Sequence, residues 1–464
     1  MFNGCGAGDP GLRAGAAITD ITPQEWPVPV IGNFDYRPAT QAHDPLSARA
    51  LVLDDGSTTL AIVVVDSCYI RRAALDDAKQ RASARTGIPT ERMLISATHT
   101  HSAPPSSPEI APRRWNLPAD VEARNVRYSE LLREGIAEAI AAAHAALQPA
   151  RLGRASASVP EELNNRRWFM TEGTIPPDPF GGTTDKVKMN PPRNSPDLIE
   201  PAGPTDPEVA MLTVESADGK PLALLAAYSL HYVGGVRRGD VSADYFAEFA
   251  RRVTDELGAG NDFVAMMANG TSGDVNNIAF TQPRTPREPY EQMRKVGERV
   301  AAAAARAWPQ AQWIESPTLG MAQRELTLER RKPTPEIYEQ SKKWLGVEDD
   351  AALPRNAKAY AQRAIDQQDG PDSVPVILQA LRIGDFAIAT TPFETFTEIG
   401  LEIKEKSPLS RSFMIELANG GEGYLPTPEQ HELGGYETWL GTNRVEKSAS
   451  RQIVVQLLEM LAEL

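Results

Sequence analysis

Six short apolar runs constrain the fold of this 464-residue chain more than any other feature. Each run ends in polar residues, and most are then closed by glycine or proline. Short apolar runs bounded by turn residues are typical of buried strands, because both faces of such a strand contact protein. The runs cover residues 60–65, 93–97, 221–230, 263–268, 386–390 and 413–417.

Helical patterns lie between several of these runs. Residues 128–147 are Ala-rich and amphipathic, and 245–257, 289–308 and 448–464 are similar. Strands that alternate with helices indicate an α/β architecture with largely parallel pairing. We therefore expect one large α/β catalytic domain over residues 11–464, with mostly parallel or mixed sheets flanked by helices. In such folds, sites form beyond the carboxyl ends of strands, where this chain places its unusual polar residues.

Three segments depart from this alternation. Residues 1–10 are expected to be a flexible N-terminus, and they do not form a complete signal peptide. Residues 171–207 read as a loop rich in Pro and Gly, and residues 328–375 as a charged, partly helical insertion. Surface decoration is the simpler interpretation of the last two, and a substrate mouth is the alternative.

Charge and cysteine content exclude several classes of protein. The net charge of -14 argues against nucleic acid or an anionic membrane surface as the main partner. Cys5 and Cys68 are the only cysteines, so neither a disulfide framework nor a Cys-rich zinc site is expected. No apolar run approaches the ~18–20 residues of a membrane-spanning helix. The oligomeric state stays open.

Three histidines and one glutamate follow the predicted strands. His99 and His101 form a His-x-His pair after the run 93–97, and residues two apart on an extended chain share a face. His231 and Glu394 follow two other runs in the same way. A catalytic zinc needs roughly three or four N/O ligands and one open position, which these residues would supply. The alternative is a pair of hydrogen-bonding loop histidines.

A Gly-rich turn follows the run 263–268. It contains Gly273, Asp274 and Asn276. Backbone N–H groups in such a turn can hold an oxyanion or a polar group of a substrate. We expect these three residues to contact substrate, and a ligand-free Asx-type turn is the alternative.

Together these motifs resemble the neutral and alkaline (non-lysosomal) ceramidase family, and the Thr98-His99-Thr100-His101-Ser102 segment is the most specific part. The resemblance runs in order through nearly the whole chain. It covers residues 14–23, 48–50 and 96–104, Asn165-Arg166, His231, Ser242-Ala243-Asp244, Asn269, Gly273-Asp274, Pro392-Phe393-Glu394, residues 423–427 and Gly435-Tyr436-Glu437.

The resemblance implies a role for each matched residue. His99, His231, Glu394 and Tyr424 match zinc ligands. His101, Arg166 and Tyr436 match residues that face the amide of the substrate and polarise or protonate it. Asn276 departs from the family, which usually has Ser there, and no C-terminal immunoglobulin-like domain is expected after the last helix.

The function implied is zinc-dependent hydrolysis of an amide (N-acyl) bond in a small-molecule or lipid-like substrate, with ceramide one candidate among several. The resemblance also favours an exported protein. One alternative is a metal-dependent ester or phosphoester hydrolase, to which Asp66 and Asp244 would contribute. The other is a non-catalytic binding protein that keeps the fold, an alternative that Asn276 favours.

Overall fold

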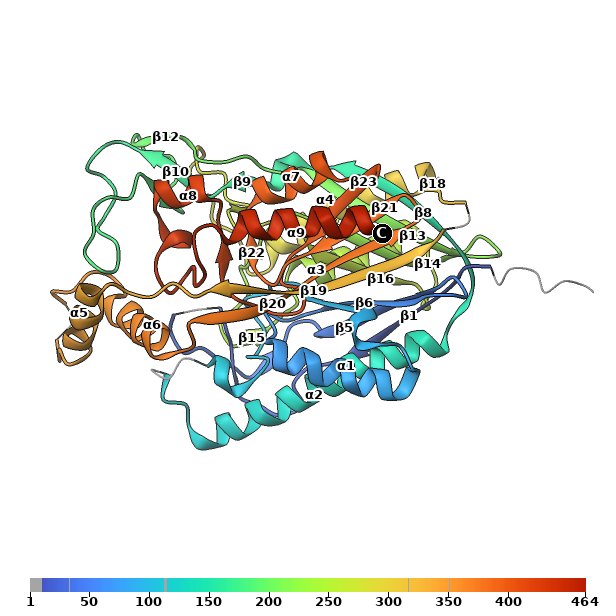
Figure 1. Ribbon diagram of the computed structural model, residues 1–464, viewed down its shortest axis with the longest axis horizontal. Helices are drawn as coiled ribbons and strands as arrows, with labels where there is room; N and C mark the ends of the chain where they lie inside the picture. Colours follow the sequence, from blue (N-terminus) through green and yellow to red (C-terminus); the bar gives the residue numbers. More distant parts are fainter. Residues whose placement is uncertain (1–10, 33, 112–114, 316, 350) are drawn as a thin grey trace, which may run out of the picture.

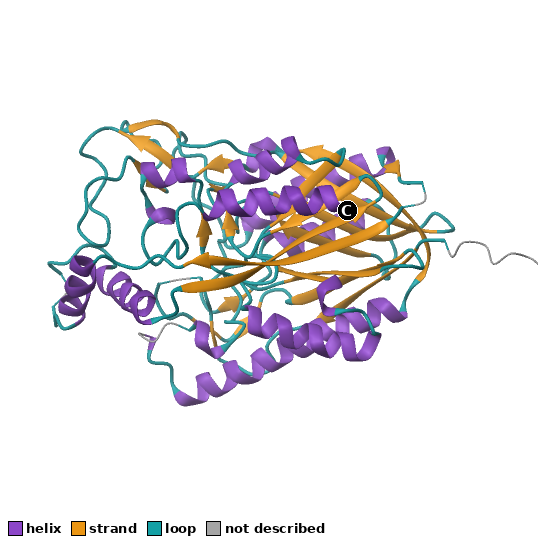
Figure 2. Ribbon diagram, viewed as in Figure 1, coloured by secondary structure: helices purple, strands orange, loops and turns teal. Residues whose placement is uncertain are grey.

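Two β-sheets packed face to face, with helices on both outer sides, form a four-layer sandwich (Figures 1 and 2). The computed structural model describes residues 11–32, 34–111, 115–315, 317–349 and 351–464, so the flexible start expected for residues 1–10 lies outside the described residues. The larger sheet has the order β16 (Val264–Asn269), β14 (Pro221–Tyr228), β13 (Glu208–Ser216), β8 (Gln148–Ser158), β1 (Arg13–Asp20), β5 (Ser47–Asp54), β6 (Thr59–Val65) and β7 (Met93–Ala97), with β18 (Gln312–Trp313) paired to β8.

The smaller sheet packs against the inner face of the larger one. Its order is β19 (Leu319–Glu329), β20 (Ser373–Ile383), β21 (Phe386–Thr390) and β23 (Arg411–Ile415). In this packing β23 lies beside β14 and β19 beside β6. Side chains from both inner faces form one buried cluster, in which Leu51 and Ile62 of the larger sheet join Leu381 and Phe413 of the smaller one. Burial on both faces explains why these strands read as continuous apolar runs.

Helices bury the outer faces. On the larger sheet, α1 (Arg72–Thr86) and α2 (Ala119–Ala145) cover the half with β5 and β6, while α3 (Tyr245–Glu256) and α4 (Glu291–Ala307) cover the half with β14 and β16. On the smaller sheet, α7 (Thr397–Lys406) and α9 (Ala449–Glu463) pack on the other side, as Figure 1 shows. Mixed sheets flanked by helices were predicted, and the structure confirms them.

The prediction that the strands pair largely in parallel was wrong. Most pairs are antiparallel, and parallel pairing within the two large sheets is confined to β6–β7, β14–β16 and β21–β23. Each of these three pairs is joined through a helix, namely α1, α3 and α7, because parallel neighbours need a long crossover. Short turns that reverse the chain join β5 to β6, β13 to β14 and β20 to β21, whereas longer segments join β1 to β5, β8 to β13 and β19 to β20. The six apolar runs of the sequence are the strands of these three units.

The two irregular segments gather at one end of the sandwich, on the left of Figure 1. Residues 171–207 contribute β11 (Val187–Met189) and β12 (Leu198–Pro201), which pair with β10 (Arg167–Met170). Residues 328–375 contribute α5 (Pro335–Leu345) and α6 (Ala357–Asp369). A hydrogen bond from Gln340 Nε2 to the Phe180 carbonyl joins the two segments.

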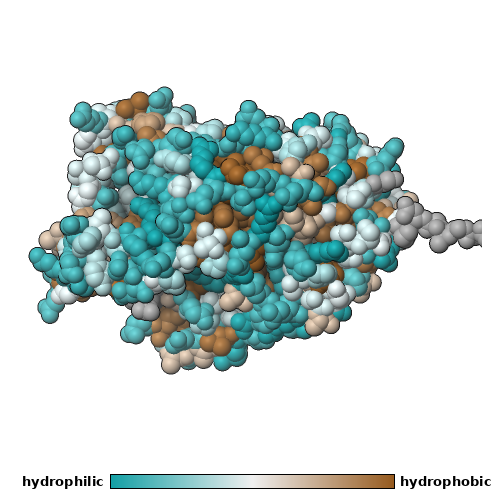
Figure 3. Space-filling view, in the orientation of Figure 1, coloured by the Kyte–Doolittle hydropathy of each residue, from teal (hydrophilic) through white to brown (hydrophobic). Residues whose placement is uncertain are grey.

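Four pairs of very short strands and one short helix complete the described β-strands and α-helices. The strand pairs are β2 (Val28–Pro29) with β3 (Pro38–Ala39), β4 (Gln41–Ala42) with β15 (Asp240–Val241), β9 (Asn164–Asn165) with β17 (Val275–Asn276) and β22 (Glu394–Thr395) with β24 (Tyr424–Leu425), and the helix is α8 (Pro428–Leu433). No described helix is long and apolar enough to cross a membrane. On the face that Figure 3 shows, apolar side chains form only separate patches in a mostly hydrophilic surface.

Candidate metal centre

Three imidazoles and one carboxylate converge where the parallel pairs end. The Nε2 atom of His99 lies 3.0 Å from that of His231 and 3.1 Å from that of His101. The Glu394 Oε2 atom lies 3.2 Å from His99 Nε2 and 3.6 Å from His231 Nε2. His99 follows β7, His231 follows β14 and Glu394 follows β21, so all three parallel units meet here.

The other ring nitrogens show which atoms face the centre of the cluster. His99 Nδ1 lies 2.8 Å from the Cys68 carbonyl oxygen, and His231 Nδ1 lies 3.1 Å from the Ser272 carbonyl oxygen. A carbonyl oxygen only accepts, so each Nδ1 carries a hydrogen, and in the neutral ring Nε2 presents a lone pair. Burial opposes protonation of His99, but the Glu394 charge raises the pKa of His99 well above its ordinary value. A positive charge, either a metal ion or a proton on His99, therefore balances the two Nε2 atoms and the carboxylate.

The donor set fits zinc. His99, His231 and Glu394 offer ligand atoms that all lie within 4.8 Å of one another. Both rings are almost fully buried, at 2% and 1% exposure, and the Glu394 Oε2 atom is buried without a hydrogen-bond partner in the described residues. Imidazole nitrogen with one carboxylate is a common ligand set for catalytic zinc. The Nδ1 contacts to backbone carbonyls are the outer-shell bonds that orient metal-binding histidines.

Cys68, His99 and His101 also lie close enough to hold an ion. In that set Cys68 Sγ faces His99 Nδ1 at 3.8 Å. That nitrogen is already committed to the Cys68 carbonyl oxygen. The geometry therefore favours the cluster of His99, His231 and Glu394.

The backbone at the cluster is held in unusual positions. His99 has φ of 71°, a left-handed conformation that is costly for a residue with a side chain. Its N–H donates to the Ser67 carbonyl, which fixes the turn. Gly273 packs against the Glu394 backbone so closely that a Cβ atom would lie 2.5 Å from the Glu394 carbonyl oxygen. Gly273 is thus required for the close approach of two strand ends.

A second layer of polar residues, which the sequence analysis missed, orients His231. Ser272 Oγ donates to Glu416 Oε1 at 2.6 Å and lies 3.2 Å from His231 Nδ1. The other Glu416 oxygen accepts from the Thr395 N–H at 2.6 Å, beside Glu394. Burial raises the pKa of Glu416 to about 8. Glu416 lies inside the predicted apolar run 413–417, directly after β23 ends at Ile415, and a carboxylate within an apolar run was the available signal.

Burial and nearby charges keep two rings of the cluster neutral. Desolvation, with the Arg166 and His99 charges, places the pKa of His231 well below its ordinary value. Desolvation, with the His99 and Arg166 charges, does the same for His101. Burial opposes ionisation of Glu394 as well, but the charge of His99 and contact with Tyr424 lower its pKa.

Arg166 is buried beside the cluster and retains a free donor. Its Nε donates to Glu437 Oε1 at 2.8 Å, and Arg167 Nη1 donates to the other Glu437 oxygen at 2.7 Å. The Arg166 Nη2 atom is buried with no hydrogen-bond partner in the described residues. Its guanidinium carbon lies 5.3 Å from the centre of the Tyr424 ring. An unpartnered cationic N–H here is suited to an oxygen of a bound molecule.

The two predicted tyrosines lie together. Glu394 and Tyr424 are direct partners in the parallel pair β22–β24, which brings the Tyr424 ring beside the cluster. The Tyr436 ring is 5.8 Å from the Tyr424 ring, edge to face. Burial raises the pKa of both phenols, so each keeps its proton near neutral pH unless a cation displaces it.

The residues expected to contact substrate in the Gly-rich turn have partners within the protein. The Asp274 carboxylate accepts from Asn165 Nδ2 and from the Thr397 N–H. The Asn276 amide donates to Asn190 Oδ1 and accepts from the Ile278 N–H. These bonds join the turn to neighbouring loops, as an Asx-type turn would, and substrate contact by Gly273, Asp274 and Asn276 stays a prediction.

Asp66 and Asp244, the two aspartates of the phosphoesterase alternative, also have partners within the protein. Asp66 forms a buried ion pair with Arg49 at 2.7 Å. Asp244 accepts from the N–H groups of Val233, Gly234 and Tyr245. Neither belongs to the groups of described residues that could hold a metal ion. The geometry therefore favours one metal over a carboxylate-rich pair.

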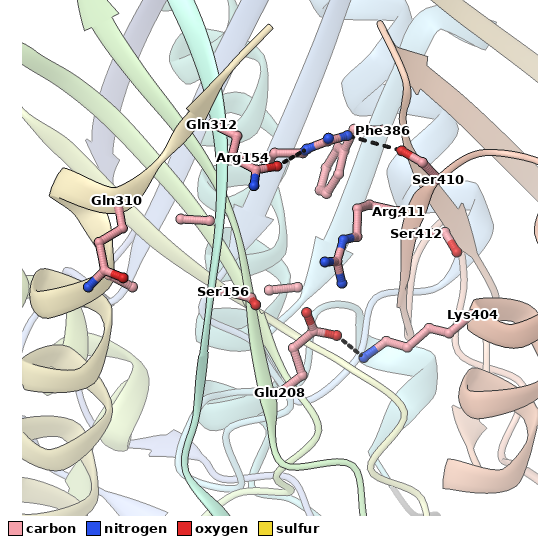
Figure 4. A pocket seen from close by; sticks show the side chains of 13 residues that line it. Arg154, Ser156, Glu208, Gln310, Gln312, Phe386, Lys404, Ser410, Arg411 and Ser412 are labelled. Carbon is pink, nitrogen blue, oxygen red and sulfur yellow. Dashed lines mark hydrogen bonds and ion pairs between the residues drawn. The ribbon is translucent and has the colours of Figure 1, made fainter.

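A pocket of about 310 Å³ lies far from this cluster (Figure 4). Phe386 and Arg411 line it from the amino ends of β21 and β23, whereas Glu394 and Glu416 follow the carboxyl ends of these strands. Lys404 is paired with Glu208 at 2.7 Å across it. The pocket is therefore separate from the metal centre.

No family model matches this chain, and no curated protein matches it. Two solved structures that match this chain are both ceramidases. The crystal structure of neutral ceramidase from Pseudomonas aeruginosa aligns with a TM-score of 0.72 and 19% identity, over 97% of this chain and 74% of that one. A ceramidase complexed with C2 aligns with a TM-score of 0.71 and 18% identity, over 97% and 75%. The resemblance in the sequence is thus confirmed in three dimensions: this chain has the fold of the bacterial neutral ceramidases.

Proposed function

We propose that this protein is a zinc-dependent hydrolase that cleaves an amide (N-acyl) bond. The observation that carries the proposal is the buried convergence of the His99, His231 and Glu394 ligand atoms, whose spacing and donor types suit a zinc ion. Tyr424, the register partner of Glu394, is the fourth proposed ligand. When bound, zinc supplies Lewis-acid chemistry, activating water near neutral pH and polarising a carbonyl.

The other residues act on the amide. We assign Arg166 Nη2 and the Tyr436 hydroxyl, whose side chains both neighbour Tyr424, to the carbonyl oxygen, where they donate as negative charge develops. His101 is half-buried, and its Nε2 lies 3.1 Å from His99 Nε2. Because its ring is neutral at rest, it can take a proton and pass it to the leaving amine.

The fold of the similar ceramidases supports amide hydrolysis over the ester or phosphoester alternative. The free Arg166 donor supports a working site over a binding protein without turnover. Export from the cell stays a prediction from the family resemblance.

Metal analysis combined with mutation tests the proposal. The purified protein should hold about one zinc per chain, and His99→Ala and His231→Ala should each lose the metal and the hydrolysis of N-acyl substrates. His144→Ala is the matched control, because His144 lies on the partly exposed end of α2. Circular dichroism reports whether each variant keeps the fold. Full zinc occupancy in both cluster variants would contradict the assignment.

A further inference from the structure

A pocket of about 210 Å³ opens next to the proposed proton carrier. His101 and Tyr232 are among the residues that line it, with their rings stacked at 3.7 Å. Arg37, Arg237 and Arg238 line it too, and all three are exposed. Three cationic side chains thus surround one hollow in a protein whose net charge is -14.

None of these arginines forms an ion pair with an acidic side chain in the described ranges. The guanidinium carbon of Arg237 lies 6.0 Å from the centre of the Tyr290 ring. Asp240 is an acidic residue that also lines the pocket. Its carboxylate oxygens already accept hydrogen bonds from Gln41 Nε2 and from the Tyr290 hydroxyl. Gln41 and Tyr290 are neutral donors, so Asp240 keeps its negative charge, but three guanidinium groups against one carboxylate leave the lining of the pocket net positive.

The segment that carries Arg237 and Arg238 is firmly anchored. Its first residue is His231, and the Asp244 carboxylate accepts from the two N–H groups at Val233 and Gly234. Further along, the Gly235 carbonyl accepts from the Tyr290 N–H and the Gly239 carbonyl from the Thr40 N–H. The backbone between the metal cluster and the arginines is consequently held in place, which lowers the entropy lost when a ligand binds.

The charge and position of the pocket select a ligand. A cleft lined by one sign of charge concentrates ligands of the opposite sign. Guanidinium groups match planar carboxylates with paired hydrogen bonds. The pocket reaches the cluster at His101, which the proposed function places at the leaving amine, so the anionic group belongs to the amine half of the substrate.

We propose that the substrate is an N-acyl amino acid whose carboxylate is bound by Arg37, Arg237 and Arg238. This inference rests on the proposed amide hydrolysis. Water adds its oxygen to the acyl carbon, the C–N bond breaks, and the nitrogen takes a proton. The products are a free carboxylic acid and an amino acid.

A matched pair of substrates tests the inference. N-lauroylglycine and N-lauroylethanolamine share the acyl chain and the amide, and they differ in the charge of the amine half. We expect kcat/KM to be at least tenfold higher for N-lauroylglycine, and this preference to shrink with added salt. Each change of Arg37, Arg237 or Arg238 to Gln should lower kcat/KM for N-lauroylglycine by about three- to tenfold, because each guanidinium is solvent-exposed and its hydrogen bond then has only ordinary net strength. The rate of each variant on N-lauroylethanolamine should stay within about twofold of the wild-type rate.

Arg411→Gln is the control, because Arg411 is an exposed arginine of the separate pocket.

The outcomes separate this inference from the function on which it rests. Equal or faster hydrolysis of N-lauroylethanolamine, or equal loss on both substrates in the arginine variants, overturns the anion site and leaves amide hydrolysis standing. Hydrolysis of neither compound contradicts the proposed function. In that case calorimetric titration with N-lauroylglycine decides: binding that weakens in the Arg237→Gln and Arg238→Gln variants supports the pocket, and binding unchanged in both overturns it.

Discussion

Replacing Glu437 by Gln tests how the free donor of Arg166 is held in place. The Glu437 carboxylate is fully buried and bridges Arg166, at 2.8 Å, and Arg167, at 2.7 Å. Gln keeps the shape but removes the charge, and its NH₂ group would face one of the two guanidinium groups. The variant therefore leaves two buried cations without their shared counter-charge.

The loss of stability follows from this burial. Removing one partner of a buried ion pair costs about 3–5 kcal/mol, and the matched shape of Gln favours the lower value. Unfolding entropy of about 2.1 cal/mol/K per residue gives roughly 1 kcal/mol/K for 464 residues. The midpoint of thermal unfolding should therefore fall by about 3 °C, measured by scanning calorimetry at fixed zinc concentration.

The two arginines should respond differently. Arg167 keeps its bonds to the Gly434 carbonyl and to Gln430, whereas Arg166 loses the acceptor of its Nε. Arg166 Nη2 should then be misplaced relative to the carbonyl oxygen, and kcat should fall about tenfold or more, since a lost oxyanion donor costs ~10²–10³. Zinc content should stay at the wild-type value.

Glu432→Gln is the control for this experiment. Glu432 is 75% exposed and lies 3.7 Å from Lys447, so its change should move the midpoint by less than about 1 °C. A Glu437→Gln protein with wild-type midpoint and wild-type kcat would refute the reasoning. A lower midpoint with unchanged kcat would show that Arg166 does not act on the substrate.

Three further predictions follow from the same geometry. Tyr436→Phe should keep zinc and lower kcat more than it raises KM, whereas Tyr424→Phe should lose zinc affinity; the opposite pattern would show that the two tyrosines have exchanged roles. Ser272→Ala should weaken zinc binding by about 10-fold, because His231 loses the nearby Ser272 hydroxyl that links its ring to Glu416. Competition with a chelator measures the zinc affinity, and an unchanged affinity would contradict this role of Ser272. Rapid-quench analysis should find no covalent acyl-enzyme on any substrate that turns over, because the side chain of Asn276 is not a nucleophile, and a trapped adduct at this position would contradict direct attack by water.

Much of the fold could be predicted from local patterns. The apolar runs 60–65 and 93–97 are strands β6 and β7, and the run 386–390 is β21, because a strand buried on both faces must be apolar throughout. The helices predicted over 245–257 and 448–464 match α3 and α9 within a few residues. The polar residues that end these runs include His99 and Glu394, which the structure brings together.

The tertiary structure decided the direction in which strands pair and the hydrogen-bond partners of the side chains near the site. Antiparallel pairs such as β1–β5 and β8–β13 join segments whose partners no local pattern specifies. Asp274 and Asn276 lie beside the site in sequence but bond to distant loops, and Ser272 and Glu416 meet only because β16 and β23 end side by side.

The amino-acid sequence by itself determined which residue types stand at the strand ends, and hence that a metal-binding chemistry was available. Only the tertiary structure decided which nitrogen of His99 faces the centre, because that depends on a carbonyl 31 positions away. It likewise decided that Arg37, far from Arg237 in the chain, lines the same pocket beside His101. The physical reason is that propensity and hydrophobic pattern act over neighbouring residues, while the direction of a side chain is set by whatever packs against it.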